Sequence, residues 1–404
     1  MSGGERRPRV FLMDLWATVP YYTAYLAKAL LAGGEVEVQA GSIDYYLDAK
    51  CYTSRGVRVD PGLVNVVGRY KLPRLPRRVL KVVEGMMNLA ALTVRFAVRP
   101  PDVVHVQYLP MLLSRLPMDL WFVEFCQGRG AKIVLTVHDL LPHDTGDAHV
   151  QVFRDLYARV DGLICHSESV RARLAAEFGV AEGRVRVIAH GPLFYDLPAT
   201  GEAESLRGRV VVLWQGILFP YKGLDVLLRA WREVEARVEG AWLVVAGTGA
   251  PELVEEMRAL AAELGLRRVR LEFRFVTAEK LVALYRRADV VVYPYRAITT
   301  SGALATGLAL GKTIVASDLP VFRELLTDGQ NARLVPPEDA GALAQALVEL
   351  AGDRVLRERL AGRARRMGFG DGAWREIAEQ TVAAYRGVLG GEFGASPLGG
   401  TKKS

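Results

Sequence analysis

Residues Tyr295–Asp318 read YRAITTSGALATGLALGKTIVASD, and this stretch decides the fold class of the chain. It follows the β-branched segment DVVVYPY (289–295) and ends in a second apolar segment, TIVASD (313–318). Between the two segments, an apolar stretch of helical character begins at Gly302. A strand, a helix and a second strand at this spacing are typical of a parallel sheet covered by helices, and therefore of an α/β protein.

The same alternation of short β-branched segments and helical patterns runs along the whole chain. We therefore predict two parallel, doubly wound sheets, one in each half. The segment PLFYDLPATGEAESLRG (192–208) has Pro, Gly and charge but no period, so we interpret it as the linker. Strands are expected at 9–14, 35–41, 63–68, 102–109, 132–139, 161–167 and 184–191 in the first half, and at 209–216, 242–249, 269–276, 289–295, 313–318 and 332–337 in the second.

Composition limits the class of protein. The chain has 404 residues, and 50% of them are hydrophobic, so it can bury a large core and divide into two domains. The net charge of +7 favours an anionic partner. A nucleic acid is not expected, because no recognised binding module is present and the basic residues are scattered over both halves. The three cysteines are far apart and odd in number, which indicates a reducing compartment. With no secretion leader and no apolar run of about 18 residues, we expect a cytoplasmic protein.

Residues that follow the strands of the second half suit a phosphate ligand, because ligands of such sheets bind outside the carboxyl ends of the strands. Gly216 would let a ligand approach the backbone, and Lys222 stands just before a helix that starts near Gly223. A lysine beside a helix N-terminus can neutralise a diphosphate, although a solvated loop lysine is the alternative. Gly247 and Gly249 would admit a ribose or a base against the backbone.

The opening stretch contains a second anion-binding feature. Thr299, Thr300 and Ser301 are natural N-caps, and Gly302 lacks a side chain that would block a phosphate. The first-turn N–H groups of a helix have no partner within the helix. We therefore predict that this helix start holds a diphosphate or sugar hydroxyls.

Six motifs occur in order along the chain: HDLLPH (138–143), HG (190–191), GILFPYKGLDVLL (216–228), AGTG (246–249), YPYRAITTSG (293–302) and ALGKTIVASDLPVFRE (309–324). This order resembles the retaining glycosyltransferases of family 4, which have the GT-B fold. The resemblance implies two Rossmann-like domains, 1–195 and 196–372, that face a central cleft. It also implies a C-terminal helix (373–390) that crosses back onto the first domain. The Gly/Ser-rich tail (391–404) is expected to be disordered.

The activity that the resemblance implies is transfer of a sugar from a nucleotide sugar, UDP- or GDP-linked, with retention at the anomeric carbon and without metal or another cofactor. Lys222 matches the family lysine that pairs with the donor diphosphate, and Gly216 matches the glycine at that strand end. Ile217 stands where the family has an arginine, so Lys222 has a larger share in neutralising the charge of the diphosphate. Arg296 is a candidate substitute for the missing arginine.

Two family glutamates, one for the donor sugar and one for the ribose, are replaced by Ile298 and Thr306. This difference from the family puts ribose binding and the choice of donor sugar in question. It suggests that N–H and hydroxyl groups bind the donor in place of the two carboxylates. The residues expected around the nucleoside are Gly247, Thr248, Gly249, Phe275, Val276 and Thr306.

His138 resembles the family histidine that contacts the donor sugar near the reacting carbon, so we expect it to be catalytic together with Lys222. Asp139 or His143 would fix its tautomer. A capped loop that closes the strand is the alternative interpretation of this segment. A metal site formed with His143 and His149 is not expected, because the three histidines lie on a Pro-containing loop.

The other histidines carry weaker signals. His105 and His166 are expected to be packed residues at strand ends. His190 and Gly191 close the first domain and could reach the phosphates.

The acceptor side is expected to be lined by Asp14, Trp16, Tyr21 and Tyr22, which stand in place of the family's glycine-rich first loop. Aromatic rings suit stacking on sugars, although core packing is the common alternative. The acceptor would be a glycan or a lipid-linked compound.

A basic segment precedes a long apolar stretch in the first half. This pattern suits an interfacial helix on an anionic membrane, at the inner face of the cell membrane, and a solvated basic loop before a core helix is the alternative. The basic residues are Arg69, Lys71, Arg74, Arg77, Arg78 and Lys81.

Three rival functions share the two-domain architecture. A nucleotide-sugar epimerase should show a paired-acid site and a phosphorylase a cofactor lysine, and neither signature is present. A catalytically silent nucleotide-sugar-binding subunit is suggested by the missing glutamates, but Lys222, His138 and the TTSG turn argue against it.

Overall fold

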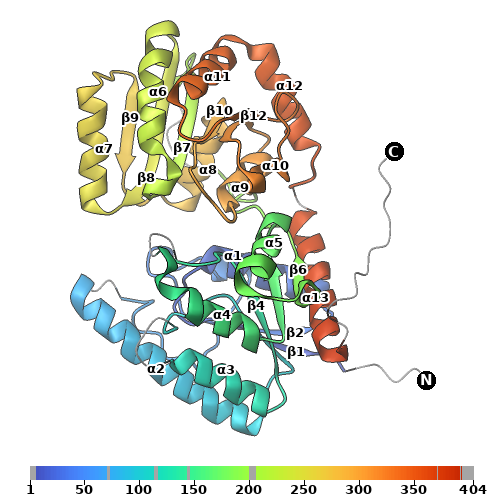
Figure 1. The fold of residues 1–404 in the computed structure, drawn as a ribbon. Coiled ribbons are helices and arrows are strands. Elements are labelled where there is room, and N and C mark those ends of the chain that lie inside the picture. The colour runs from blue at the N-terminus through green and yellow to red at the C-terminus, as the bar shows by residue number, and fades with distance from the viewer. Residues whose placement is uncertain are drawn as a thin grey trace, which may run out of the picture. The chain divides into compact units, whose positions relative to one another are not determined.

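The computed structural model describes residues 6–70, 73–112, 117–142, 146–199, 206–370, 372–391 and 393. They fall into two compact units (Figure 1). Unit 1 comprises the chain up to Ala189 and from Trp374 onward, and unit 2 is His190–Ala373. Residues 200–205 of the expected linker lie outside the described residues, as does the expected tail apart from Gly391 and Phe393.

Unit 1 contains a parallel six-stranded sheet in the order β2-β1-β3-β4-β5-β6. Strands β3 and β5 are buried along their whole length, as expected for parallel strands covered on both faces, whose sequences are continuous apolar runs. The strands are β1 (Arg9–Asp14), β2 (Glu37–Ser42), β3 (Val103–Val106), β4 (Lys132–Thr136), β5 (Gly162–Cys165) and β6 (Val185–Val187). The helices are α1 (Pro20–Gly33), α2 (Arg74–Val98), α3 (Met118–Gly128), α4 (Val150–Arg159), α5 (Glu168–Phe178) and α13 (Ala373–Gly390), with 3-10 turns η1 (Thr53–Arg55), η2 (Gly146–His149) and η3 (Glu182–Arg184).

The strand expected at 63–68 is wrong, because this segment is a loop. Its backbone bonds to buried side chains of α2 instead of to a neighbouring strand. The N–H of Val64 donates to Oδ1 of Asn88 at 2.7 Å, and the N–H of Val66 donates to Oε2 of Glu84 at 2.7 Å. Buried backbone donors need partners, and here a carboxylate and an amide supply them.

Unit 2 contains a second parallel six-stranded sheet, in the order β12-β11-β10-β7-β8-β9, so the doubly wound α/β prediction is confirmed. The strands are β7 (Val210–Leu218), β8 (Ala241–Gly249), β9 (Val269–Phe273), β10 (Val290–Tyr293), β11 (Thr313–Ser317) and β12 (Arg333–Val335). The helices are α6 (Leu224–Arg237), α7 (Pro251–Glu263), α8 (Ala278–Arg287), α9 (Gly302–Ala309), α10 (Pro320–Arg323), α11 (Ala340–Gly352) and α12 (Arg354–Arg365), with the 3-10 turn η5 (Pro220–Lys222).

The strand order reverses once in each sheet. In unit 1 the chain passes from β1 to β2 and then to β3, on the other side of β1. In unit 2 it passes from β7 through β8 and β9 and then to β10, on the other side of β7. Ligands of open parallel sheets bind outside the carboxyl ends of the strands at such a reversal. The segments that follow β1 and β3, and those that follow β7 and β10, are therefore the places to look for a site.

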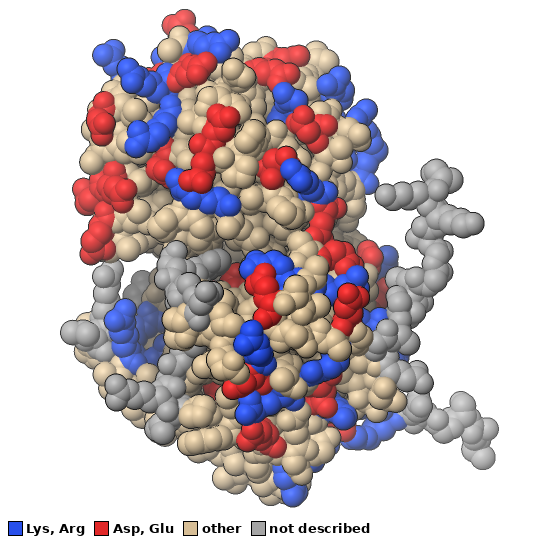
Figure 2. All heavy atoms as spheres, in the orientation of Figure 1, with Lys and Arg blue, Asp and Glu red and all other residues tan. Residues whose placement is uncertain are grey.

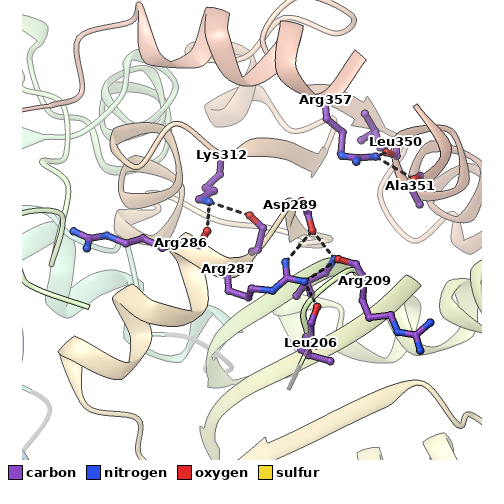
Figure 3. Close-up of polar contacts among 11 residues, drawn as sticks. Leu206, Arg209, Arg286, Arg287, Asp289, Lys312, Leu350, Ala351 and Arg357 are labelled. Atoms are coloured by element: carbon purple, nitrogen blue, oxygen red, sulfur yellow. Dashed lines mark hydrogen bonds and ion pairs between the residues drawn. The ribbon is translucent and has the colours of Figure 1, made fainter. Parts of the chain in front are cut away.

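Basic side chains hold helix ends and loops together in unit 2 (Figure 3). Lys312 donates from Nζ to the carbonyl oxygens of Arg286 and Ala288, both at 2.9 Å, where α8 ends. Arg287 donates to the carbonyl oxygens of Leu206 and Arg209. Burial lowers the pKa of Lys312 to about 8. The lysine of the ALGK motif therefore closes a helix C-terminus, where free carbonyl groups favour cations.

Helix α13 is part of unit 1 (Figure 1). It supplies two buried aromatic residues, Trp374 and Tyr385. Trp374 stacks on Tyr25 with ring centroids 5.4 Å apart. The hydroxyl of Tyr385 lies 2.7 Å from Nδ1 of His105. The first turn of α13 is thus tied to α1, and a later turn is tied to β3.

The surface and the cysteines complete the description. On the face drawn in Figure 2, basic and acidic side chains are interspersed. Cys51, Cys126 and Cys165 are buried and are not joined in disulfides. Within the described ranges, every helix is too short or too polar to cross a bilayer.

Candidate functional site

A lysine lies against a glycine near the carboxyl end of β7. A Cβ atom built on Gly216 would be 2.7 Å from Nζ of Lys222, so the missing side chain makes room for the amine. The glycine has φ +144°, a conformation that other residues rarely adopt. The structure thus brings together the two residues that the sequence assigns to the donor diphosphate. The strand continues for two residues beyond Gly216, through the half-exposed Ile217.

The loops that follow β7 and β10 are bonded to one another. The N–H of Arg296 donates to the carbonyl oxygen of Tyr221 at 2.7 Å. A Cβ on Gly223 would lie 1.9 Å from the carbonyl oxygen of Pro294, so only glycine fits there. Because β7 and β10 flank the reversal of strand order, this pair of loops is where a ligand of the sheet is expected.

Arg296 braces these loops through a set of ion pairs. Its guanidinium donates to both carboxylate oxygens of Asp225, at 2.9 and 2.7 Å, and to Glu338 at 2.8 Å. It also donates to the carbonyl oxygen of Pro220 at 2.6 Å. The hydrogen bonds that Arg296 donates to Asp225 raise the pKa of Arg296 further above its usual value. Two carboxylates already balance its charge, so a direct contact with a diphosphate would require an exchange of partners.

The start of α9 has the cap that the sequence predicts. The Ser301 hydroxyl accepts from the N–H of Leu304 at 3.1 Å. A Cβ on Gly302 would lie 2.6 Å from Cε1 of His190, so the imidazole rests on the first turn of the helix. Thr299 and Thr300 precede the cap and are half-buried. His190 thus lies beside the predicted anion-binding turn.

The hydroxyl of Thr306, a predicted ribose contact, forms hydrogen bonds within unit 2. Thr306 is 2% exposed, and its hydroxyl accepts from the N–H of Leu193 at 3.0 Å. The same hydroxyl lies 2.8 Å from the carbonyl oxygen of Gly302 and 3.1 Å from that of Leu193. At the position of the first missing glutamate, Ile298 packs against the apolar core of unit 2. Thr306 and Ile298, which stand in place of the two glutamates, therefore both contribute to the packing of unit 2.

The other nucleoside candidates lie along β8 and after β9. Gly247 pairs with Gly216, and a Cβ on Gly247 would lie 1.8 Å from the Gly216 carbonyl oxygen. Thr248 is exposed. Phe275 and Val276 are half-buried just beyond the end of β9, the neighbour of β8.

In unit 1, His138 belongs to a chain of hydrogen-bonded side chains at the carboxyl ends of β3, β4 and β5. Its Nε2 lies 3.0 Å from Oε1 of Gln107, and its Nδ1 lies 3.4 Å from Nε2 of His166. Nε2 of Gln107 lies 3.0 Å from Nε2 of His105, and Nδ1 of His105 lies 2.7 Å from the hydroxyl of Tyr385. The tautomer partners expected for His138 were Asp139 and His143. Gln107 and His166 lie against the two ring nitrogens of His138, and His143 lies outside the described residues.

The hydrogen bonds of the neighbouring histidines determine which groups face the ring of His138. Nδ1 of His166 lies 2.9 Å from the carbonyl oxygen of Ile188, so it donates, and Nε2 of the neutral ring accepts. Burial lowers the pKa of His166 to about 4 and that of His105 to about 3, so both remain neutral. Oε1 of Gln107 and Nε2 of His166 therefore present acceptors to the two ring nitrogens of His138.

Gln107 and His166 were not recognised as site residues from the sequence. Both follow strands that neighbour β4, which precedes His138. The sequence signal that could have identified them is a polar residue just past the end of each of two strands that neighbour the strand before His138. His105 and His166 are buried, as expected for packed strand-end residues.

The acceptor-side residues divide into two pairs. Asp14 is buried and accepts from the N–H groups of Thr18 at 2.8 Å and Val19 at 3.0 Å, just before α1. Burial raises its pKa to about 6. Tyr22 is buried edge-on against His138, with ring centroids 4.8 Å apart.

The second pair, Trp16 and Tyr21, is half-buried. Nζ of Lys81 lies 5.0 Å from the Trp16 ring, and the Tyr21 hydroxyl donates to Asp48 at 3.0 Å. Trp16 and Tyr21 therefore remain accessible to a ligand, whereas Asp14 and Tyr22 support the elements behind them. Among the described residues, no group of three or more His, Cys, Asp or Glu side chains is arranged to hold a metal ion.

Comparisons with known proteins agree with this geometry. The sequence profile described as "Glycosyltransferase Family 4" matches residues 19–191, and that described as "Glycosyl transferases group 1" matches residues 209–353. A phosphatidyl-myo-inositol mannosyltransferase of Mycobacterium leprae is 36% identical over 67% of this chain and 70% of its own length. The D-inositol 3-phosphate glycosyltransferase 1 of Catenulispora acidiphila is 27% identical over 94% of this chain and 97% of its own.

Among solved structures, Anabaena HepE in complex with UDP and glucose superposes with a TM-score of 0.71 at 16% identity. The match covers 93% of this chain and all of HepE. At this identity the likeness concerns the fold.

Proposed function

The chain belongs to glycosyltransferase family 4 and is a GT-B hexosyltransferase with a nucleotide-sugar donor, and we propose that it transfers the sugar to a glycan or lipid-linked acceptor with retention of anomeric configuration and without a metal ion. The observation that carries the proposal is the placement of the Lys222 amine over Gly216, beside the point where the strand order of unit 2 reverses. The relatives named above support a polyol or glycolipid acceptor, and HepE supports a UDP-sugar as a candidate donor.

In the proposed reaction, the bond between the anomeric carbon and the diphosphate oxygen breaks, and the acceptor oxygen bonds to that carbon on the same face. The acceptor proton passes to the leaving diphosphate, so no separate base is required. Lys222 and the first turn of α9 stabilise the negative charge that develops on the diphosphate. His138 orients the sugar, and its hydrogen bonds to Gln107 and His166 hold its ring in place.

The test is release of nucleoside diphosphate from UDP-, GDP- and ADP-sugars in the presence of a chelator, with a lipid extract as the source of acceptor. We expect acceptor-dependent release from one donor, loss of release in Lys222→Met, and an anomeric configuration in the product that matches the donor by NMR. Inversion at the anomeric carbon would contradict the retaining mechanism. Donor binding without release, across all donors and acceptors, would instead identify a silent subunit.

We propose that α2 brings unit 1 to an anionic membrane. One stripe of this helix is apolar and exposed, including Val79 (68% exposed), Met87 (52%) and Val94 (70%). Arg69 and Arg78 near its start are exposed and basic. Apolar burial combined with attraction of about 1 kcal/mol per basic residue is the usual basis of interfacial binding. Lys71 and the side chain of Arg74, also predicted to take part, lie outside the described residues.

Flotation with vesicles tests this contact. The protein should float with phosphatidylglycerol vesicles and not with phosphatidylcholine vesicles, and Met87→Asp should reduce the bound fraction. Val355 is 76% exposed on α12 of unit 2, so Val355→Asp is the matched control. Equal flotation of the two variants would contradict the assignment to α2.

A further inference from the structure

Arg77 and Lys81 form a pair of cations on the inner side of α2. They stand four residues apart, so they share one face of the helix. The guanidinium carbon of Arg77 lies 3.1 Å from the centre of the Tyr46 ring, and Nζ of Lys81 lies 5.0 Å from the centre of the Trp16 ring. Both side chains are half-buried, whereas Arg78 between them is exposed. These two cations therefore face unit 1, away from the proposed membrane stripe.

Trp16 is seated on the same helix. A Cβ on Gly85 would lie 2.6 Å from Nε1 of Trp16, so the indole N–H edge rests where α2 has no side chain. Gly85 lies one turn beyond Lys81. The indole, the amine and the guanidinium are thus held by packing against rings and helix backbone.

Two donor atoms of these side chains have no hydrogen-bond acceptor among the described residues. In the described part of the chain, Nε of Arg77 and Nε1 of Trp16 are buried without a hydrogen-bond partner. Within those same ranges, no carboxylate forms an ion pair with Arg77 or Lys81, in contrast to Arg95 of the same helix, which is paired with Asp60. Burial, and next the charge of Arg77, lower the pKa of Lys81, while Asp14 raises it.

Two neighbouring cations without a carboxylate partner among the described residues are unfavourable unless an anion binds. A phosphate group offers acceptor oxygens to guanidinium and ammonium alike. Trp16 follows β1, at the reversal of strand order in the sheet of unit 1. The cluster therefore stands where a ligand of this sheet is expected.

We propose that Arg77 and Lys81, held beside the Tyr46 and Trp16 rings, bind a phosphate group of the acceptor, so that the acceptor is a phosphorylated hydroxyl compound. The proposal rests on the glycosyltransferase function above and specifies its acceptor class. The phosphate belongs either to a water-soluble phosphorylated polyol or to a phospholipid headgroup, and the experiment separates the two sources.

Thermal shift of the full-length protein tests phosphate binding directly. Inorganic phosphate and glycerol 3-phosphate should raise the melting temperature, and glycerol should not. Lys81→Met and Arg77→Met should weaken the apparent affinity for phosphate at least about tenfold, because each removes a charge-assisted hydrogen bond. Arg58 is exposed in the same unit, and Arg58→Met is the matched control that keeps binding.

Equal phosphate binding in Arg77→Met, Lys81→Met and Arg58→Met, or no binding by the unsubstituted protein, would overturn the proposal. Phosphatidylinositol vesicles with a matched anionic-lipid control provide the lipid arm. Lys81-dependent binding of vesicles but not of glycerol 3-phosphate would assign the phosphate to a lipid. Titration with the nucleotide-sugar donors in the absence of acceptor is the separate readout of the proposed function. Donor binding should be unchanged in Arg58→Met, and its absence from the unsubstituted protein would count against the donor assignment alone.

Discussion

Nδ1 of His138 lies 3.4 Å from Nε2 of His166, whose other ring nitrogen donates to the carbonyl oxygen of Ile188. Because that carbonyl can only accept, the orientation of the His166 ring is defined, and His166 presents an acceptor to His138. A buried histidine thus positions the half-buried histidine that the family resemblance connects with the donor sugar.

Replacement of His166 by Phe should lower kcat about fivefold, because one hydrogen bond to His138, of about 1 kcal/mol, is lost. The aromatic contact with Tyr22 would be kept. His166→Gln, which can accept a hydrogen bond, should recover most of the activity. Equal losses in the Phe and Gln variants would indicate a general packing defect instead of a positioning role.

Replacement of Lys222 by Met should lower kcat about 100-fold, because a cation beside the leaving diphosphate stabilises charge that develops in the transition state. Arg229→Met, an exposed change on α6, is the control and should leave kcat unchanged. Steady-state kinetics separates the alternatives, since a rise in the donor KM without a change in kcat would assign Lys222 to ground-state binding only.

Replacement of Thr306 by Val should destabilise the protein by about 2 kcal/mol, since the Leu193 N–H would lose its hydrogen-bond acceptor. The donor KM should stay within about twofold, because the hydroxyl is used within unit 2. Urea denaturation and donor titration measure the two effects. A large increase in the donor KM with unchanged stability would restore Thr306 to the ribose site.

Replacement of Gly247 by Ala should destabilise the protein by about 3 kcal/mol, because the new Cβ would lie 1.8 Å from the Gly216 carbonyl oxygen. Gly240→Ala is the matched control, since a Cβ there has nothing within 4 Å. Similar unfolding midpoints for the two variants would show that β7 and β8 can separate without cost.

The contribution of the two buried histidines to stability should be lost on acidification. Burial lowers the pKa of His105 to about 3 and that of His166 to about 4, from 6.5 in the unfolded chain. Their contribution is complete above pH 6.5 and is lost as pH falls towards pH 4, at about 2 kcal/mol per histidine by pH 5. Burial raises the pKa of Asp14 to about 6 and that of Asp119 to about 7, so their contributions run in the opposite direction and are lost as pH rises.

A comparison of variants isolates the histidine effect. Denaturation of His105→Gln at pH 7.5 and pH 5 should show about 2 kcal/mol less acid sensitivity than the unsubstituted protein. An identical pH dependence in both proteins would mean that His105 does not remain neutral in the folded state.

The sequence alone predicts the α/β class, the two doubly wound sheets and an N-cap among Thr299, Thr300 and Ser301. Parallel strands that are buried on both faces appear as continuous apolar runs, and caps and tight turns depend on residues only a few positions apart. The strand expected at 63–68 had the right composition, but buried acceptors on α2 took its backbone donors.

The partners of the site residues were decided only by the tertiary structure. Gln107 and His166 reach His138 because β3, β4 and β5 are neighbours, and Asp225 reaches Arg296 because the loops after β7 and β10 meet. Local sequence patterns specify which segments are strands and which faces are apolar. The order of strands in a sheet, and with it the contact between side chains far apart in the chain, depends on the packing of the whole unit.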